Sequence, residues 1–281
     1  MWDFLSTLLS SWLSLLFSLF GPLLIFGLIL YLFARFTRIL YRRSAGTWLD
    51  ALVTGWIGTP VHETGHAVFC LLFGHRITDM RLFSPNPSDG TLGYVIHSYN
   101  KKNIYHRAGN FFIGFGPIIF GAAVIFLLMT WMVPANGEIK NCLSTCPVSF
   151  AGFNDFFSSA WNAGKCLIET LFCAVNMKSF MFWLFLYACF SIASHMELSP
   201  PDLRTVWSGF IIIAVLILII LAILMAVDTD TGFIDSYASS WLKFSGMYVL
   251  VTTLSALNLV ASFLLINLIS IPFKGKFVHP F

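Results

Sequence analysis

The chain has 281 residues, of which 58% are hydrophobic and 10% are charged, and its formal net charge is +3. Its mean hydropathy of +0.82 lies far above the range of soluble globular domains. This composition indicates a polytopic membrane protein. It excludes an ordinary soluble enzyme, and because the basic residues sit in short loops it gives no support to nucleic-acid binding.

Apolar runs of about 20 residues, the length that crosses a bilayer, organise the chain. The first run, 4–34, is interrupted by Gly21 and Pro22, which predicts either an interfacial helix joined to a span or one kinked, tilted helix. We therefore expect an N-terminal membrane anchor over residues 1–48. A signal peptide is not expected, because no basic region precedes this run and no small-residue cleavage pattern ends it.

The second run, 49–74, contains the motif His62-Glu63-x-x-His66. On a helix the two histidines lie one turn apart on the same side, so both imidazoles can bind one zinc ion while Glu63 stands beside a metal-bound water. Without partners, such polar side chains would each cost on the order of several kcal/mol to bury in an apolar helix. The motif therefore predicts Zn²⁺ as the cofactor, with Glu63 as a general base.

The most polar stretch of the chain, 75–107, follows the metal motif. Two strand-like segments, 77–83 and 91–97, flank a run of turn formers, which predicts a β-hairpin; an ordinary solvated loop is the alternative. The edge formed by 91–97 could bind an extended peptide through main-chain hydrogen bonds. The residues expected to contact such a peptide are Thr91, Tyr94, Val95 and Ile96.

Further apolar runs complete the predicted fold. They are 108–133, 179–196, 206–227 and 245–272. With the two earlier runs they predict an all-α polytopic membrane protein of about six membrane segments, with a small β-hairpin between the zinc helix and the next span. We expect a core at 49–205 that includes a loop at 134–178, followed by C-terminal transmembrane helices at 206–281.

Catalytic zinc usually has three protein ligands, so a third ligand is expected outside the motif helix. The segment 194–202 ends an aromatic-rich span and offers several candidates. These are His195, Glu197 and Asp202. Two prolines break the helix before Asp202, so this residue can turn back toward the metal on non-helical backbone. Asp202 is the expected ligand, with the other two as alternatives, and a helix N-cap is the competing interpretation of Asp202.

These motifs together resemble the site-2 protease family of intramembrane zinc peptidases. In that family a membrane-embedded His-Glu-x-x-His motif is followed, two spans later, by a Pro-rich segment that carries an Asp ligand. The segment 199–204 is similar to it, although no Gly follows Asp202 and His195 has no counterpart. The segment 114–121 is similar to the small-residue pattern of the family's second core helix, and close helix packing explains its glycines equally well.

The resemblance implies hydrolysis of peptide bonds in membrane-embedded substrates. Zinc held by His62, His66 and Asp202 would activate a water, and Glu63 would take its proton during attack on the peptide carbonyl. In a divergent branch, His195 could stabilise the oxyanion. The implied partners are a transmembrane protein substrate and the lipid bilayer.

Two other functions compete with this interpretation. A membrane zinc peptidase of the prenyl-protein-processing kind would take a Glu as its third ligand, and Glu197 is the only candidate near the right region. A non-catalytic membrane binding protein derived from a protease would be expected to lose Glu63, which this chain retains.

Basic residues in 75–107 place that loop in the cytoplasm by the positive-inside rule. We therefore expect a multi-pass protein of the plasma or inner membrane, with the site nearer the cytoplasmic face. The basic cluster between Arg35 and Arg43 contradicts this, because a full crossing by 49–74 leaves it outside. Either 49–74 is partly re-entrant, or this cluster is an exception to the rule.

Counting spans onward places the loop 134–178 outside, where its cysteines predict a disulfide. They are Cys142, Cys146, Cys166 and Cys173. The histidines remote from the metal motif and from 194–202 are expected to be loop residues rather than ligands. They are His75, His97, His106 and His279.

Overall fold

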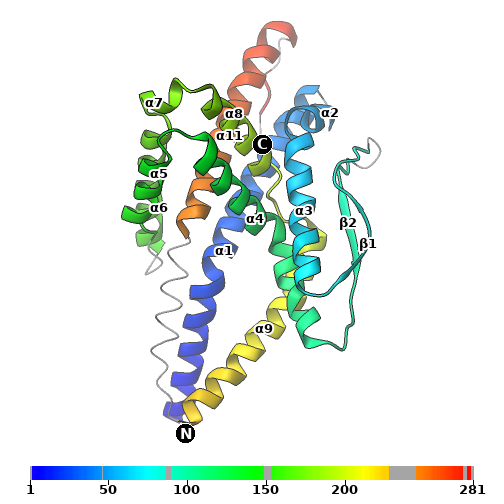
Figure 1. Ribbon diagram of the computed structural model, residues 1–281, viewed down its shortest axis with the longest axis vertical. Helices are drawn as coiled ribbons and strands as arrows, with labels where there is room; N and C mark the ends of the chain where they lie inside the picture. Colours follow the sequence, from blue (N-terminus) through cyan, green and yellow to red (C-terminus); the bar gives the residue numbers. More distant parts are fainter. Residues whose placement is uncertain are drawn as a thin grey trace.

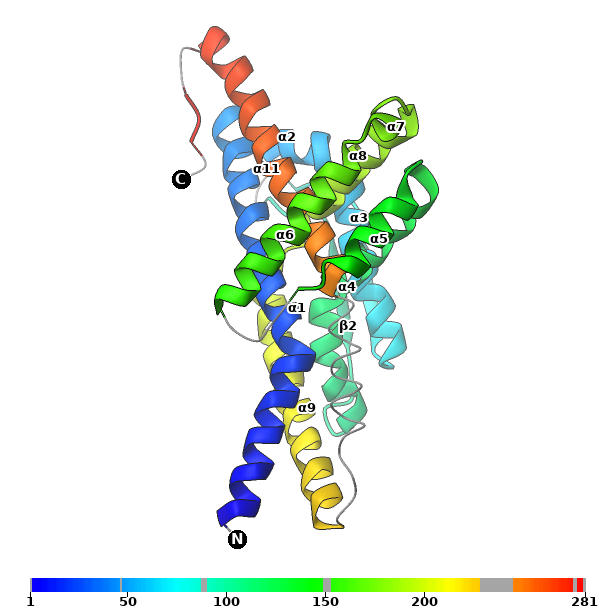
Figure 2. The same ribbon diagram turned by 90° about the vertical axis from the view of Figure 1, so that its left-hand side faces the viewer.

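The computed structural model describes residues 2–45, 47–86, 90–148, 153–227, 245–274 and 277–279. Long helices dominate the described chain, and one two-stranded antiparallel sheet lies beside them (Figures 1 and 2). The predicted all-α polytopic membrane protein with a small hairpin is therefore confirmed.

The N-terminal part consists of α1 (Trp2–Ala45), α2 (Thr47–Asp50), the π-helical segment η1 (Ala51–Gly55) and α3 (Trp56–Leu72). Helix α1 is continuous through Pro22, so the predicted anchor is one long helix rather than two pieces. The predicted run 49–74 is divided among three short elements, of which α3 carries the metal motif.

The hairpin consists of β1 (Arg76–Arg81) and β2 (Tyr94–Ser98). The remaining helices are α4 (Ile104–Met132), α5 (Asn136–Thr145), α6 (Phe153–Leu171), α7 (Ala174–Met177), α8 (Phe180–Ala193), α9 (Pro200–Ala226) and α11 (Ser245–Lys274). Within the described residues, four helices are long and apolar enough to cross a membrane, fewer than the six expected. Helix α3 has 17 residues because α2 and η1 occupy the first part of the predicted run, and α8 has 14 because the helix ends at Ala193, before the loop that leads to α9.

Helix α4 lies between α3 and α9, and its glycines explain how closely the three helices approach. A Cβ on Gly116 would lie 2.7 Å from the carbonyl oxygen of Gly65 in α3. A Cβ on Gly114 would lie 2.9 Å from the carbonyl oxygen of Asp202 in α9. Backbone atoms cannot move away as a flexible side chain can, so only glycine fits at these crossings. The helix that carries the metal motif and the helix that carries Asp202 thus both pack closely against α4.

The predicted hairpin is confirmed as an antiparallel pair in which Arg76 faces Ser98 and Arg81 faces Tyr94. Backbone pairing continues toward the tip, where the Ser84 amide donates to the Leu92 carbonyl at 2.6 Å. Strand β2 begins at Tyr94, so the regular strand predicted from residue 91 was wrong for 91–93. Of the predicted turn, 84–90, residues 87–89 lie outside the described residues.

The segment 134–178, predicted as a loop, is largely helical and contains α5, α6 and α7. Its predicted disulfide is confirmed and joins Cys142 to Cys166. Hydrophobic side chains of α5 and α6, including Ile139 and Leu167, are fully buried in the same core as α4 and α8. Burial of these side chains keeps the segment helical, although most residues of α5 are polar.

Candidate metal centre

Three side chains from α3 and α9 converge with geometry that suits a metal ion. The Nε2 atoms of His62 and His66 lie 3.2 Å apart, and Asp202 Oδ1 lies 3.4 Å from His66 Nε2. All three ligand atoms lie within 4.8 Å of one another. Metal–ligand bonds of about 2.0–2.1 Å at tetrahedral angles separate two ligand atoms by about 3.3 Å. The residues present therefore fit a tetrahedrally coordinated metal ion.

Backbone carbonyls fix the orientation of both imidazoles. His62 Nδ1 donates to the carbonyl oxygen of His195 at 2.5 Å, and His66 Nδ1 donates to that of Ile113 at 2.8 Å. A carbonyl accepts only from an N–H, so in each neutral ring the proton sits on Nδ1 and the lone pair on Nε2. Both lone pairs are thus directed at the shared position, as in metal-binding histidines generally.

Asp202 is a candidate metal ligand and also takes part in the cap of α9. Its Oδ2 accepts from the Ser199 amide at 2.8 Å and from the Ser199 hydroxyl at 2.5 Å, while Oδ1 faces His66. Ser199 is the N-cap of α9 and Asp202 is the third helical residue, so together they form a capping box. The competing interpretation of Asp202 as the N-cap itself is therefore wrong, because Ser199 occupies that position.

The two alternative third ligands point elsewhere. The His195 ring faces Asp50, with Nε2 at 3.8 Å from Asp50 Oδ1, and only its backbone carbonyl reaches His62. Glu197 forms an ion pair with Arg38 of α1. The structure thus brings Asp202, and neither of these two side chains, to the histidine pair.

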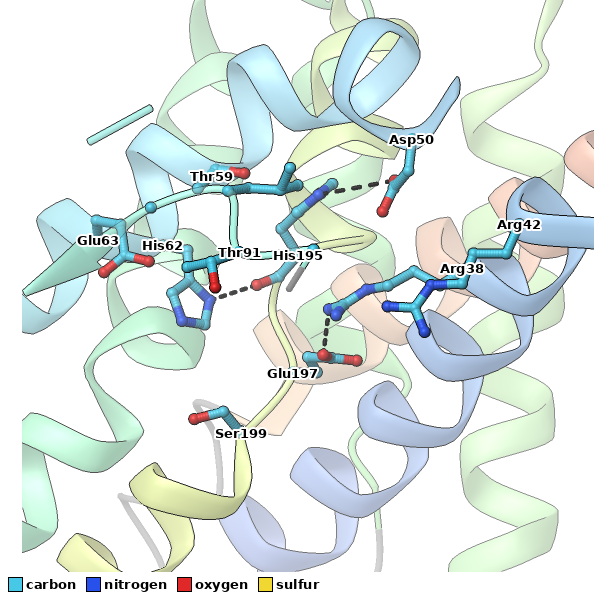
Figure 3. A pocket seen from close by; sticks show the side chains of 13 residues that line it. Arg38, Arg42, Asp50, Thr59, His62, Glu63, Thr91, His195, Glu197 and Ser199 are labelled. Carbon is cyan, nitrogen blue, oxygen red and sulfur yellow. Dashed lines mark hydrogen bonds and ion pairs between the residues drawn. The ribbon is translucent and has the colours of Figure 1, made fainter. Parts of the chain in front are cut away.

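A cavity of about 230 Å³ opens beside the candidate metal centre. Glu63 lines it, is only 7% exposed, and makes no hydrogen bond or ion pair to any residue that the structure describes. Figure 3 shows Glu63 and His62 together on one side of this cavity. A buried carboxylate without a partner is costly, so Glu63 requires a water, a proton or a ligand in the cavity.

The far side of the cavity is formed by charged residues that the sequence interpretation had not assigned to the site. They are Arg38 and Arg42 from α1 and Asp50 from α2, and Figure 3 shows them across the cavity from Glu63. From the sequence alone, the arginines indicated only membrane topology. Asp50, the last residue of a short helix, belongs to no motif that would have pointed to a site. Their place at the site follows from the packing of α1 against the loop before α9, which no local pattern reveals.

The hairpin reaches the cavity through Thr91, Leu92 and Gly93 rather than through its regular strand. Gly93 packs directly against the candidate base, since a Cβ there would lie 2.9 Å from Glu63 Cγ. Among the other residues expected to contact a peptide, the Tyr94 hydroxyl donates a hydrogen bond to the Asp79 carboxylate across the sheet, and the Ile96 side chain is exposed. Val95 pairs with Met80 on β1.

Two of the histidines assigned to loops lie instead in regular structure, His97 in β2 and His106 in the first turn of α4. His75, just beyond α3, lies against both of them. This part of the molecule is separate from the cavity beside Glu63.

Comparison of the chain with protein-family models, characterised protein sequences and solved structures gives no match.

Proposed function

We propose that this membrane protein is an intramembrane zinc metalloprotease that hydrolyses peptide bonds of membrane-embedded substrates. One observation carries the proposal: two imidazole Nε2 atoms and one carboxylate oxygen converge at zinc-ligand spacing, next to the Glu63 carboxylate, which faces a cavity and has no partner among the described residues. Zinc keeps an open coordination position for water in catalytic sites with three protein ligands.

The residues of the chain have separate roles in the proposed reaction. His62, His66 and Asp202 would hold the ion, which when bound supplies Lewis-acid chemistry and lowers the pKa of water to about 7. Glu63 accepts one proton from the attacking water as the new C–O bond forms, and donates it to the amine nitrogen as the C–N bond breaks. The overall reaction consumes one water and yields one carboxylate and one amine.

The extended segment 91–93 supports a peptide as substrate. A transmembrane helix hides its carbonyls in internal hydrogen bonds, so the substrate must unwind before it is attacked. Leu92 and Gly93 line the cavity at the side of Glu63, where an unwound strand could lie across the extended backbone. The proposed contact surface therefore moves from β2 to the segment just before it.

A comparison of wild type with Glu63→Gln tests the proposal. Both proteins are produced in the same host, and new protein N-termini in the membrane fraction are quantified by mass spectrometry. Purified proteins are then incubated with the candidate substrates in H₂¹⁸O, where hydrolysis adds one ¹⁸O to each new carboxylate. We expect cleavages within membrane segments that are present with wild type and at least ~10³-fold weaker with Glu63→Gln.

Metal content serves as the control in this experiment. Glu63→Gln should retain the same metal content as wild type, because the amide keeps the size of the side chain and lies outside the ligand set. His62→Ala and His66→Ala should each lose one equivalent of zinc. Equal cleavage by wild type and Glu63→Gln, with ¹⁸O incorporated in both, would contradict the proposed base.

A further inference from the structure

A second group of metal-ligating side chains lies where the end of α3 meets the hairpin. It consists of Cys70 in α3, His75 just beyond it and His97 in β2, and the three ligand atoms lie within 4.8 Å of one another. None of these residues lines the cavity beside Glu63. Cys70 is fully buried and His75 is 3% exposed, whereas His97 is partly exposed, so two of the three candidate ligands are enclosed by protein.

The turn that ends α3 brings Cys70 and His75 together. Gly74 adopts a positive φ of 69°, a conformation that glycine reaches without strain and that commonly ends helices. The chain folds back there, and the His75 amide donates to the Cys70 carbonyl at 2.8 Å. Two candidate ligands that are five residues apart in sequence are thus close together at the C-terminal end of α3.

The second histidine comes from the paired strand. The register of the hairpin places His97 opposite Ile77, beside the end of α3. His97 Nδ1 lies 3.0 Å from His75 Nδ1. Two ring nitrogens at this distance either share one proton or bind one metal ion.

The hydrogen bond at the other nitrogen of His75 leaves the lone pair on Nδ1 available to a metal ion. His75 Nε2 donates to the carbonyl of His106 at 2.8 Å, so the neutral ring has its lone pair on Nδ1, the atom that faces His97. Neutral imidazoles and a cysteine sulfur form a donor set that zinc prefers.

We propose that Cys70, His75 and His97 form a second zinc site, which fastens the hairpin to the helix carrying the His-Glu-x-x-His motif. Three protein ligands leave the fourth position for water. The ring of Tyr99 stacks on His75 at 4.5 Å between centroids and covers the site from one side. Because the hairpin also supplies the segment 91–93, zinc at this position would hold that segment against Glu63.

Zinc titration of the full-length purified protein tests the second site. Wild type should bind two equivalents of Zn²⁺, and His62→Ala/His66→Ala should retain one. Cys70→Ser and His97→Ala, each introduced into that double variant, should remove the remaining equivalent. One equivalent in wild type together with none in His62→Ala/His66→Ala would overturn the proposal, as would full retention after either added change.

Cobalt spectroscopy identifies the sulfur ligand independently of zinc stoichiometry. Co²⁺ added to His62→Ala/His66→Ala should give thiolate-to-metal charge-transfer absorption in the near-ultraviolet, and Cys70→Ser should abolish it. Cys189→Ser is the matched control, because Cys189 is an equally buried free cysteine in α8 outside the group. Absorption that persists in Cys70→Ser and disappears in Cys189→Ser would assign the sulfur to another place and refute the site.

Discussion

Asp202 reaches His66 with one carboxylate oxygen while the other holds Ser199. Oδ1 lies 3.4 Å from His66 Nε2, and Oδ2 accepts both from the amide and from the hydroxyl of Ser199. The start of α9 therefore orients the third ligand of the candidate metal centre. A capping box that normally stabilises only a helix end here also orients a candidate metal ligand.

Replacing the three candidate third ligands one at a time should show which of them binds the metal. We expect Asp202→Ala to lose one equivalent of zinc, and His195→Ala and Glu197→Gln to retain wild-type content, because their side chains face Asp50 and Arg38. Metal analysis of the three purified variants beside wild type measures this. Full zinc content in Asp202→Ala would remove Asp202 from the ligand set.

Ser199→Ala should weaken metal binding although Ser199 is not a ligand. Loss of the hydroxyl removes one of the two hydrogen bonds that Ser199 donates to Asp202 Oδ2, and loss of such orienting partners typically costs about 10–100-fold in metal affinity. The same change should destabilise the start of α9 by about 1 kcal/mol. Competition with a chelator of known affinity measures the first effect.

Thr205→Ala is the matched control, because within the part of the chain that the structure describes the Thr205 hydroxyl donates a hydrogen bond only to the Pro201 carbonyl on the same helix. Unchanged affinity in Ser199→Ala, or an equal loss in Thr205→Ala, would show that the capping box does not orient the ligand.

Gly93→Ala should impair cleavage and spare the metal. The added Cβ would lie 2.9 Å from Glu63 Cγ and equally close to the carbonyl oxygens of Arg81 and Leu82, so either Glu63 or the extended segment must move. A displacement of about 1 Å near the reacting groups can cost ~10²-fold in rate. The measurement is kcat/KM on a substrate identified with wild type, alongside zinc content. Gly137→Ala, with nothing within 4 Å of its new Cβ, is the control and should behave as wild type.

Gly65→Ala should destabilise the fold at the crossing of α3 and α4. A Cβ there would lie 2.8 Å from the backbone carbonyl of Gly116, which cannot rotate away. Overpacking of this kind costs about 1–3 kcal/mol, and we expect a lower Tm in detergent by thermal fluorescence. In Gly164→Ala in α6, the Thr253 hydroxyl at 3.6 Å is the one described atom near the new Cβ, and this variant should have the same Tm as wild type. A Gly65→Ala protein as stable as wild type would mean that the helices do not cross this closely.

The disulfide between Cys142 and Cys166 should be found in protein digested without reduction. We expect a cross-linked peptide that joins α5 to α6, and its retention in Cys146→Ser, although the Cys146 sulfur lies within 4.8 Å of both partners. Removal of the bridge should lower stability by about 3 kcal/mol, the order expected for a closed loop of 24 residues. Alkylation of both cysteines without a reducing agent would contradict the bridge.

Local patterns were sufficient for much of the fold and for part of the site. Membrane helices were predictable because apolar runs of bilayer length need no partner to be recognised. His62 and His66 were predictable because the period of the helix alone places them on one side. The hairpin followed from turn formers between strand-like segments, although its second strand begins three residues later than expected, and residues 91–93 line the cavity instead.

Contacts between distant segments decided the rest. Asp202, rather than His195 or Glu197, meets the histidines because glycines at 114 and 116 let α4 hold α3 and α9 closely together. The arginines at 38 and 42 enter the cavity because the end of α1 packs beside the loop before α9. Cys70, His75 and His97 meet through a glycine turn and the strand register. A sequence encodes each residue's chemistry and local period, but which side chains face one another depends on crossing distances and registers that only the packed chain defines.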